Sequence, residues 1–218
     1  MRERTELLLM MAVALWPIPA PADAGPEMDL AFKGGINAAT LDGDNSVHRE
    51  GVTGGLAGAL QWPLVNRWSL AGQVELLYTP RGADVIFEGA YLGGFRQRYL
   101  DVAVAARPQV RLGPVSVYVL LGGSLSFLLS ADRETPSGAK EDITDDLRRI
   151  DVALLAGAGG ALYLPHRELG PLRLGTVFLE ARHDHGLIEA IAGNESFKNR
   201  VTSVMLGVSF ALAAGRAE

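Results

Sequence analysis

Apolar residues alternate with small or polar residues in about eight separate segments of this chain. Residues 115–130 give the clearest case, because Val117, Val119 and Leu121 alternate there with residues such as Ser116. Side chains two positions apart lie on the same face of a strand, so each segment predicts a β-strand with one continuous apolar face. A chain with eight such strands has to cover this face, and a closed barrel in an outer membrane does so by presenting it to lipid.

The predicted strands are separated by connections of two kinds. We expect strands at residues 30–40, 52–64, 68–79, 97–111, 115–130, 149–164, 172–187 and 199–212. The connections are short at 65–68, 112–114 and 165–171, and longer and more polar at 41–51, 80–96, 131–148 and 188–198. Short turns at one end and long loops at the other are typical of bacterial outer-membrane barrels. The sequence therefore predicts an all-β fold, an eight-stranded antiparallel up-and-down transmembrane β-barrel whose long loops face outward.

The first residues of the chain have the character of an export signal. Arg2 and Arg4 precede an apolar run at residues 7–16, and Ala22 and Ala24 have the spacing of a signal-peptidase site. The apolar run is far shorter than the roughly 20 residues that a transmembrane helix needs. We therefore expect residues 1–24 to be a cleaved signal peptide and residues 25–218 to form the barrel domain.

The composition excludes several classes of function. The chain has no cysteine, which excludes thiol catalysis, a thiolate metal site and a lipid anchor on cysteine. Its formal net charge is −5 and its basic residues do not form a stripe, so we expect no nucleic-acid partner. After the signal, Gly, Ser or a charge interrupts each apolar stretch before it reaches helix-spanning length, so we expect no transmembrane helix.

The face opposite the apolar one carries Gly, Ala and a few charged residues. The interior of an eight-stranded barrel is only wide enough for side chains, and buried charges are tolerable only when they are paired. The sequence therefore predicts a neutralising polar network that plugs the lumen, whereas a small-ligand site or a narrow gate is the alternative. The expected members of this network are Lys33, Glu75, Asp101, Arg107, Glu180 and Arg182.

Aromatic residues are expected at the membrane interfaces, where amphipathic rings are favoured. The candidates are Trp62, Trp68, Tyr78 and Phe210. His183 and His185 share one strand face, where they could bind a metal, serve an esterase or replace interfacial aromatic residues. A lipid esterase would need a serine and a carboxylate beside the histidine, but Ser203 and Glu180 are expected to face inward.

Two further segments allow a functional and a structural interpretation. Residues 42–45 begin like a calcium loop, but no glutamate stands at the twelfth position, which favours a solvated turn. The acidic run at residues 140–146 could bind divalent cations that bridge lipopolysaccharide, or it could be a solvated outer loop. The glycines at residues 157–160 precede no Lys-Ser or Lys-Thr pair, so no phosphate loop is expected there.

Several short motifs follow one another along the chain. They are KGGINAATL at 33–41, QVELLY at 73–78, YLDV at 99–102, LSFLLS at 125–130, EARHDHGL at 180–187, KNRV at 198–201 and LGVSF at 206–210. Their order and spacing resemble the PorT-like outer-membrane β-barrel domain family. The resemblance implies an eight-stranded barrel in the outer membrane of a Gram-negative bacterium. It implies no activity, because a role in secretion does not follow from the fold.

Together, these observations predict an integral outer-membrane protein with a structural, adhesive or envelope-assembly role. We expect a monomer without catalytic residues, metal or cofactor. Its expected partners are outer-membrane lipid, lipopolysaccharide and the barrel-insertion machinery. Three alternatives remain open at this point: a small pore or ligand carrier, a lipid-modifying enzyme of the outer membrane, and a soluble periplasmic calycin-like barrel whose apolar face surrounds a ligand.

Overall fold

The computed structural model describes residues 26–41, 46–169, 172–189 and 198–212. Its elements in chain order are β1 (Glu27–Leu41), β2 (Ser46–Pro63), β3 (Trp68–Phe87), β4 (Ala90–Leu112), β5 (Val115–Glu134), β6 (Lys140–Asp142), the 3₁₀ helix η1 (Thr144–Asp146), β7 (Ile150–Leu169), β8 (Leu172–Glu189) and β9 (Lys198–Leu212). A tilted strand needs about 9–11 residues to cross a bilayer, and every strand except β6 is longer than that. The predicted signal at residues 1–24 lies outside the described residues.

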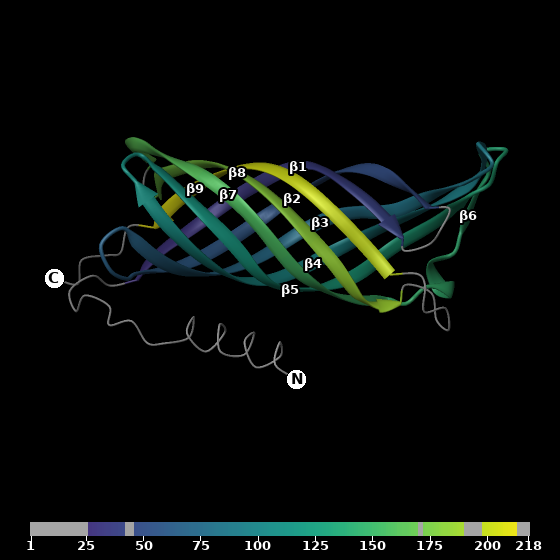
Figure 1. Ribbon diagram of the computed structural model, residues 1–218, viewed down its shortest axis with the longest axis horizontal. Coiled ribbons are helices and arrows are strands. Elements are labelled where there is room, and N and C mark those ends of the chain that lie inside the picture. Colours follow the sequence, from purple (N-terminus) through teal and green to yellow (C-terminus); the bar gives the residue numbers. More distant parts are fainter. Residues whose placement is uncertain (1–25, 42–45, 170–171, 190–197, 213–218) are drawn as a thin grey trace, which may run out of the picture.

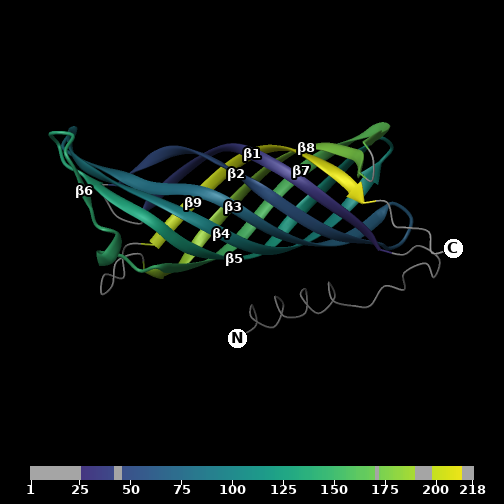
Figure 2. The same ribbon diagram turned by 180° about the vertical axis from the view of Figure 1, so that it is seen from behind.

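Eight of these strands form a closed antiparallel ring. The order around the ring is β4-β3-β2-β1-β9-β8-β7-β5, and pairing of β4 with β5 joins the two edges. Asp29 of β1 pairs with Ala211 of β9, so β1 begins and β9 ends at one end of the barrel, the terminal end. The opposite end is the distal end, where β6 pairs with β5 outside the ring (Figures 1 and 2). The predicted eight-stranded up-and-down barrel is confirmed.

The wall of the barrel is apolar outside and polar inside. Ile36, Val52 and Leu206 point outward and are 66%, 73% and 60% exposed. Buried side chains are mainly alanine, polar or charged. Lipid tails are a favourable environment for such an outer wall, whereas water is not. The soluble barrel with an apolar interior is therefore wrong. Among the described residues, no helix has the length and apolar character needed to cross a bilayer.

Two turns at the terminal end are short, as the sequence predicts. Between β2 and β3, the N–H of Trp68 donates to the carbonyl of Val65 at 3.1 Å, and Asn66 has a φ of 57°. Between β4 and β5, the turn consists of Gly113 and Pro114, with a φ of 70° at the glycine. Asn and Gly adopt positive φ at low cost, which explains why the strands reverse direction at these positions.

The long loop expected at residues 80–96 is wrong. β3 and β4 continue through this segment and end in a two-residue turn, Glu88-Gly89, where φ is 48° and 80°. Two consecutive positive φ values define a type I′ turn, whose twist matches that of paired strands. β4 therefore has 23 residues, roughly twice the length that crosses a bilayer. The hairpin of β3 and β4 projects beyond the ring at the distal end (Figure 1).

A β-bulge changes the expected face of Ser130. The sequence pattern puts Ser130 on the polar face with Ser124 and Ser126. In the pairing of β4 with β5, however, Arg98 lies opposite Ser130 and the next pair is Tyr99 with Leu128, so one residue of β5 is extra. The extra residue shifts the alternation by one position. Ser130 consequently bonds to the exposed Arg98 instead of facing the lumen.

Candidate functional site

Five charged side chains meet near the middle of the lumen and form the central layer. Lys33 Nζ lies 2.5 Å from Glu75 Oε1 and 2.8 Å from Glu180 Oε1. Arg182 Nη1 lies 2.6 Å from Glu75 Oε2, and its Nε lies 3.1 Å from Asp184 Oδ2. In the ring, three strands separate β3 from β8 in either direction, so the contact between Glu75 and Arg182 bridges opposite walls. The central layer thus crosses the lumen.

A second set of ion pairs lies in the lumen toward the distal end. Arg81 donates to Asp101 at 2.9 Å, to Asp151 at 2.8 Å and to Ser126 at 2.7 Å. Its guanidinium also lies 4.6 Å from the ring centroid of Tyr99. The sequence analysis missed Arg81 because this residue falls in the long loop that was expected at residues 80–96. The alternation of Thr79 and Arg81, both buried, would have extended the strand and found it.

The connection between β5 and β7 packs against inner-facing residues of β4 and β5 toward the distal end. Leu147 is buried against Tyr99 and Leu128, and the N–H of Ile143 donates to the carbonyl of Ala131 at 3.0 Å. Asp142, in the acidic run, accepts hydrogen bonds from the hydroxyl and the N–H of Thr144, which lower the pKa of its carboxyl. No group of three or more potential metal ligands occurs in the part of the chain that the structure describes.

Apolar side chains share the lumen with the central layer and extend from it toward the terminal end. Tyr118, Leu120, Leu155 and Phe178 form a buried cluster with neighbouring alanines. A Cβ at Gly159 would overlap the Tyr118 ring, so this glycine makes room for the aromatic side chain. The Tyr118 hydroxyl donates to Glu180 Oε2 at 3.4 Å and connects the cluster to the central layer. The lumen is therefore filled by apolar as well as charged groups.

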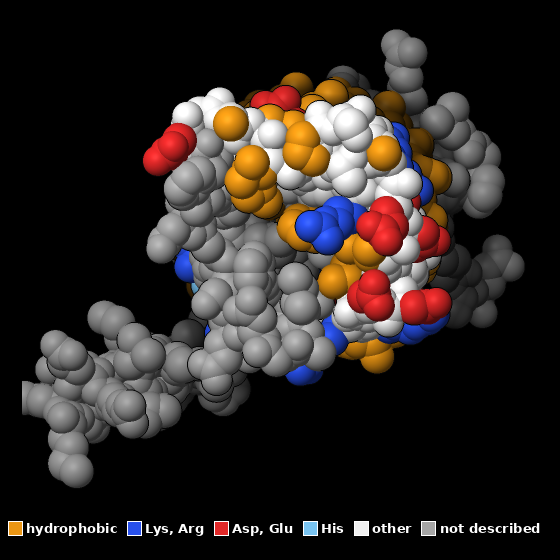
Figure 3. Space-filling view, turned by 90° about the vertical axis from the view of Figure 1, so that its right-hand side faces the viewer, with side chains coloured by type: hydrophobic (Ala, Val, Ile, Leu, Met, Phe, Trp, Pro, Cys, Tyr) orange, Lys and Arg blue, Asp and Glu red, His pale blue; other side chains and the backbone are white. Residues whose placement is uncertain are grey.

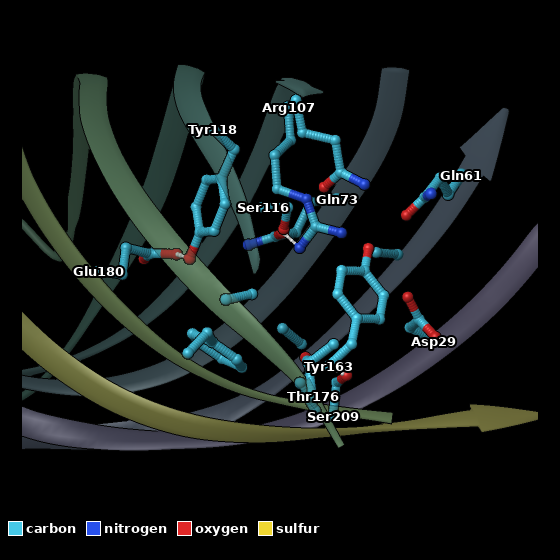
Figure 4. Close-up of a pocket in the computed structure, with 16 residues that line it drawn as sticks. Asp29, Gln61, Gln73, Arg107, Ser116, Tyr118, Tyr163, Thr176, Glu180 and Ser209 are labelled. Carbon is cyan, nitrogen blue, oxygen red and sulfur yellow. Dashed lines mark hydrogen bonds between the residues drawn. The ribbon is translucent and has the colours of Figure 1, made fainter. Parts of the chain in front are cut away.

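Arg107 lies in a small cavity between this cluster and the terminal end (Figure 4). Its Nη1 donates to Gln73 Oε1 at 2.9 Å, and its guanidinium lies 5.3 Å from the Tyr118 ring centroid. The cavity has a volume of about 30 Å³, room for roughly two water molecules. It shares Gln61 and Tyr163 with a wider space of about 470 Å³ at the terminal mouth. Of the six residues predicted in the lumen, Arg107 alone lies outside the ion pairs.

Basic and acidic side chains alternate near the distal end and form what we name the rim cluster. Its members are Arg49, Asp84, Arg96, Arg98, Asp132 and Glu134. Arg49 and Arg96 contact Glu134 at 3.3 and 2.7 Å, and Arg98 contacts Asp132 at 3.4 Å. Partial burial raises the pKa of Glu134, but the two arginines outweigh it and hold that pKa below its usual value. Figure 3 shows the mixture of blue and red side chains at this end.

The predicted interfacial aromatic residues lie on the outer wall. Trp62 and Trp68 are exposed beside the turn between β2 and β3 at the terminal end. Phe210 packs edge to face on Phe32, with ring centroids 6.2 Å apart. Tyr78 is exposed on the half of β3 nearer the distal end. Aromatic rings therefore occur toward both ends of the apolar belt.

The histidines also lie on the outer wall. His183 is exposed, and its Nδ1 lies 3.0 Å from Thr202 Oγ1. His185 is half-buried on the same face. Ser203 and Glu180 are buried inside the barrel, as expected from the alternation. The serine, histidine and carboxylate of an esterase are therefore not brought together by these residues.

Comparison with known proteins finds one matching family and several similar solved structures. The profile of the family described as "Outer membrane protein beta-barrel domain" matches residues 26–192. The crystal structure of Ail from Yersinia pestis, in complex with the heparin analogue sucrose octasulfate, is 17% identical over 84% of this chain and 99% of Ail, with a TM-score of 0.39. Neisserial surface protein A is 15% identical over 85% and 99%, with a TM-score of 0.43, and OprG from Pseudomonas aeruginosa is 12% identical over 87% and 97%, with a TM-score of 0.38. No curated protein sequence matches the chain.

Proposed function

Because this chain belongs to the outer membrane protein beta-barrel domain family and lies in the outer membrane, we propose that it is a closed anchor without catalytic activity. It holds the distal parts of β3, β4 and β5 outside the cell in a structural or adhesive role. Short turns and both chain ends of such barrels face the periplasm, so the terminal end is the periplasmic one. The distal end, with the projecting hairpin and the rim cluster, is then the surface that meets outside partners.

The observation that carries this proposal is the contact between Glu75 and Arg182 across the lumen. This contact, the pairs around Arg81 and the packing of Leu147 against Tyr99 occupy successive levels of one narrow barrel. Breaking a buried pair leaves an uncompensated charge, which is costly, so spontaneous opening is disfavoured. A barrel closed in this way offers its outer surfaces for function.

Conductance in planar bilayers tests the proposal against the pore alternative. We expect no conductance steps from the purified wild-type barrel. The double variant Glu75→Ala with Arg182→Ala removes one anion and one cation together. The Arg81 pairs and the apolar cluster remain in this variant, so we expect at most small and infrequent conductance steps from it. A heat-dependent shift in gel mobility confirms that the variant has folded. Regular conductance steps from the wild type would overturn the closed anchor.

Lipopolysaccharide is the partner that the rim cluster fits best. Arg96 and Arg98 are 39% and 49% exposed at the side chain and lie next to the apolar belt of β4, on its distal side. Arginine binds phosphate through two parallel hydrogen bonds, and exposed ion pairs exchange partners at little cost. We expect lipopolysaccharide to raise the unfolding temperature of the barrel in vesicles. The double variant Arg96→Gln with Arg98→Gln loses this rise, whereas Arg111→Gln at the opposite end keeps it.

Several finer features belong to the same proposal. The order of motifs from residues 33–41 to 206–210 supports a place in the PorT-like branch of the family. Export through a signal at residues 1–24, delivery by the barrel-insertion machinery and a monomeric state complete it. The aromatic residues at both ends of the belt, such as Trp68 and Tyr78, anchor the barrel at the two interfaces. Light scattering of the detergent-solubilised protein measures the oligomeric state, and a dimer would contradict the monomer.

A further inference from the structure

The basic side chains of the lumen are neutralised unequally. Lys33, Arg81 and Arg182 each contact two carboxylates within 4.0 Å. Arg107 makes one hydrogen bond, to the neutral side chain of Gln73, and no ion pair with a described residue. Its Nε is buried without a hydrogen-bond partner. A guanidinium has five N–H donors, so most of its donors are unused by the protein.

A second buried group points to the same space. Ser116 is 1% exposed, lines the cavity with Arg107, and its Oγ has no hydrogen-bond partner. Figure 4 shows Arg107 between the rings of Tyr118 and Tyr163, with Ser116 behind it. Buried polar groups are normally satisfied, so two unsatisfied groups around one cavity indicate a place for a polar ligand. The cavity adjoins the wider space at the terminal mouth, and the cluster and the central layer lie on its other side.

The size and charge of the cavity select the ligand. The planar fork of arginine matches the two oxygens of a carboxylate. About 30 Å³ admits the two oxygens of a carboxylate, whereas the wider mouth can take the carbon atoms of the ligand. Asp29 and Glu180 line the cavity as well, and Glu180 is paired with Lys33. The charge of Asp29 disfavours a second anionic group on the ligand.

We propose that the Arg107 cavity binds a small monocarboxylate of two or three carbons that enters from the periplasm. The carboxylate accepts hydrogen bonds from Arg107 and from the hydroxyl of Ser116. The end of the ligand that faces Asp29 is neutral or carries an ammonium group. Binding at this site does not depend on whether the barrel is closed above it.

Titration of the isotope-labelled barrel in zwitterionic micelles, followed by amide NMR shifts, tests the site. Sodium acetate and glycine are the probes, and sodium malonate and sodium chloride at matched ionic strength are the comparisons. We expect saturable shifts at Ser116 and Gly159, none at Gly89, and binding of malonate at least about tenfold weaker than that of acetate. If acetate binds and glycine does not, the ligand is a simple acid. If both bind, amino acids belong to the ligand class.

Variants of the arginine separate a site from general anion binding. Arg107→Gln should weaken acetate binding by about tenfold or more, because a charge-assisted hydrogen bond is lost. Arg107→Lys keeps the positive charge but not the planar fork, so its acetate affinity should lie between those of the wild type and Arg107→Gln. Arg98→Gln, at the other end of the barrel, should bind acetate like the wild type. Equal shifts with chloride, no saturable shift with any carboxylate, or unchanged affinity in Arg107→Gln would each overturn the proposal. Conductance of the wild type would overturn the closed anchor but not this site.

Discussion

The two halves of the lumen are built by the same eight strands, yet their charged side chains differ in whether they form ion pairs. From the central layer to the distal end, Lys33, Arg81 and Arg182 each meet two carboxylates. Toward the terminal end, Arg107 and Asp29 line one cavity without an ion pair between them. The distal half is held by electrostatics, whereas the terminal half leaves its charges available.

The difference arises from the side chains that surround each charge. Around Arg107 the wall carries Ala57, Ala59 and Ala161, whose small side chains leave space that long side chains do not fill. Around Glu75, long side chains from opposite walls reach one another. Whether a charged side chain is paired thus depends on the length and volume of the side chains around it. A polar residue in the lumen is therefore not always part of the ion-pair network that fills the barrel. Substitutions at matched positions in the two halves test this contrast.

The largest expected difference is between the same substitution in the two halves. Arg182→Gln leaves Glu75 and Asp184 with less compensation in a buried site, so we expect the free energy of unfolding to fall by about 3–5 kcal/mol. Arg107→Gln deprives no carboxylate of an ion-pair partner, so we expect about 1 kcal/mol or less. Urea unfolding from lipid vesicles measures both, and equal losses would show that the two halves are not distinct.

A smaller difference is expected between two adjacent glycines. Gly159 faces the lumen, where a methyl group would meet the Tyr118 ring and the backbone of Leu179, so Gly159→Ala should cost about 1–3 kcal/mol. Gly160 faces outward, and the nearest atom to a Cβ there is Ser116 O at 3.6 Å, so Gly160→Ala should be tolerated. The same unfolding experiment compares them, and a larger loss at Gly160 would reverse the assignment of faces.

The link between the two halves is expected to be weak. Tyr118→Phe removes the hydroxyl that donates to Glu180 at 3.4 Å and keeps the ring in its place over Gly159. Glu180 retains its contact with Lys33, so we expect a loss of about 0.5–1 kcal/mol. A double-mutant cycle with Arg182→Gln should give nearly additive effects, and strong coupling would mean that the cluster and the central layer act as one unit.

The smallest expected effect is a shift in the pKa of Glu134 in the rim cluster. Desolvation opposes the lowered pKa of Glu134, but hydrogen bonds and charges from Arg49 and Arg96 prevail. The stabilisation from this group is therefore complete above the unfolded-state pKa and disappears as the pH falls through the lower folded-state pKa. Carboxyl NMR titration should place the midpoint of Glu134 below that of an unpaired glutamate. Arg49→Gln should move it upward, and an unchanged midpoint would remove Arg49 as a cause.

Much of the fold was predictable from alternation, because the side-chain period of a strand is two. The strand from Val115 to Leu128 follows its predicted pattern, and Gly113-Pro114 forms the predicted turn. The prediction from alternation failed where a bulge or a tight turn interrupts the regular strand. The extra residue beside Ser130 changes its face, and the two-residue turn at Glu88-Gly89 was hidden in a polar segment that composition alone assigns to a loop.

Along the regular strands, alternation alone showed which residues face the lumen, because it assigns each side chain to one of two faces. It predicted Glu75, Arg107 and Arg182 on one face without indicating which of them would meet. Only the closed ring decided that Glu75 reaches Arg182 from the opposite wall and that Arg107 contacts no carboxylate. Contacts across a lumen depend on the register of strands far apart in the chain and on the volume of the side chains between them, and neither is encoded in a local pattern.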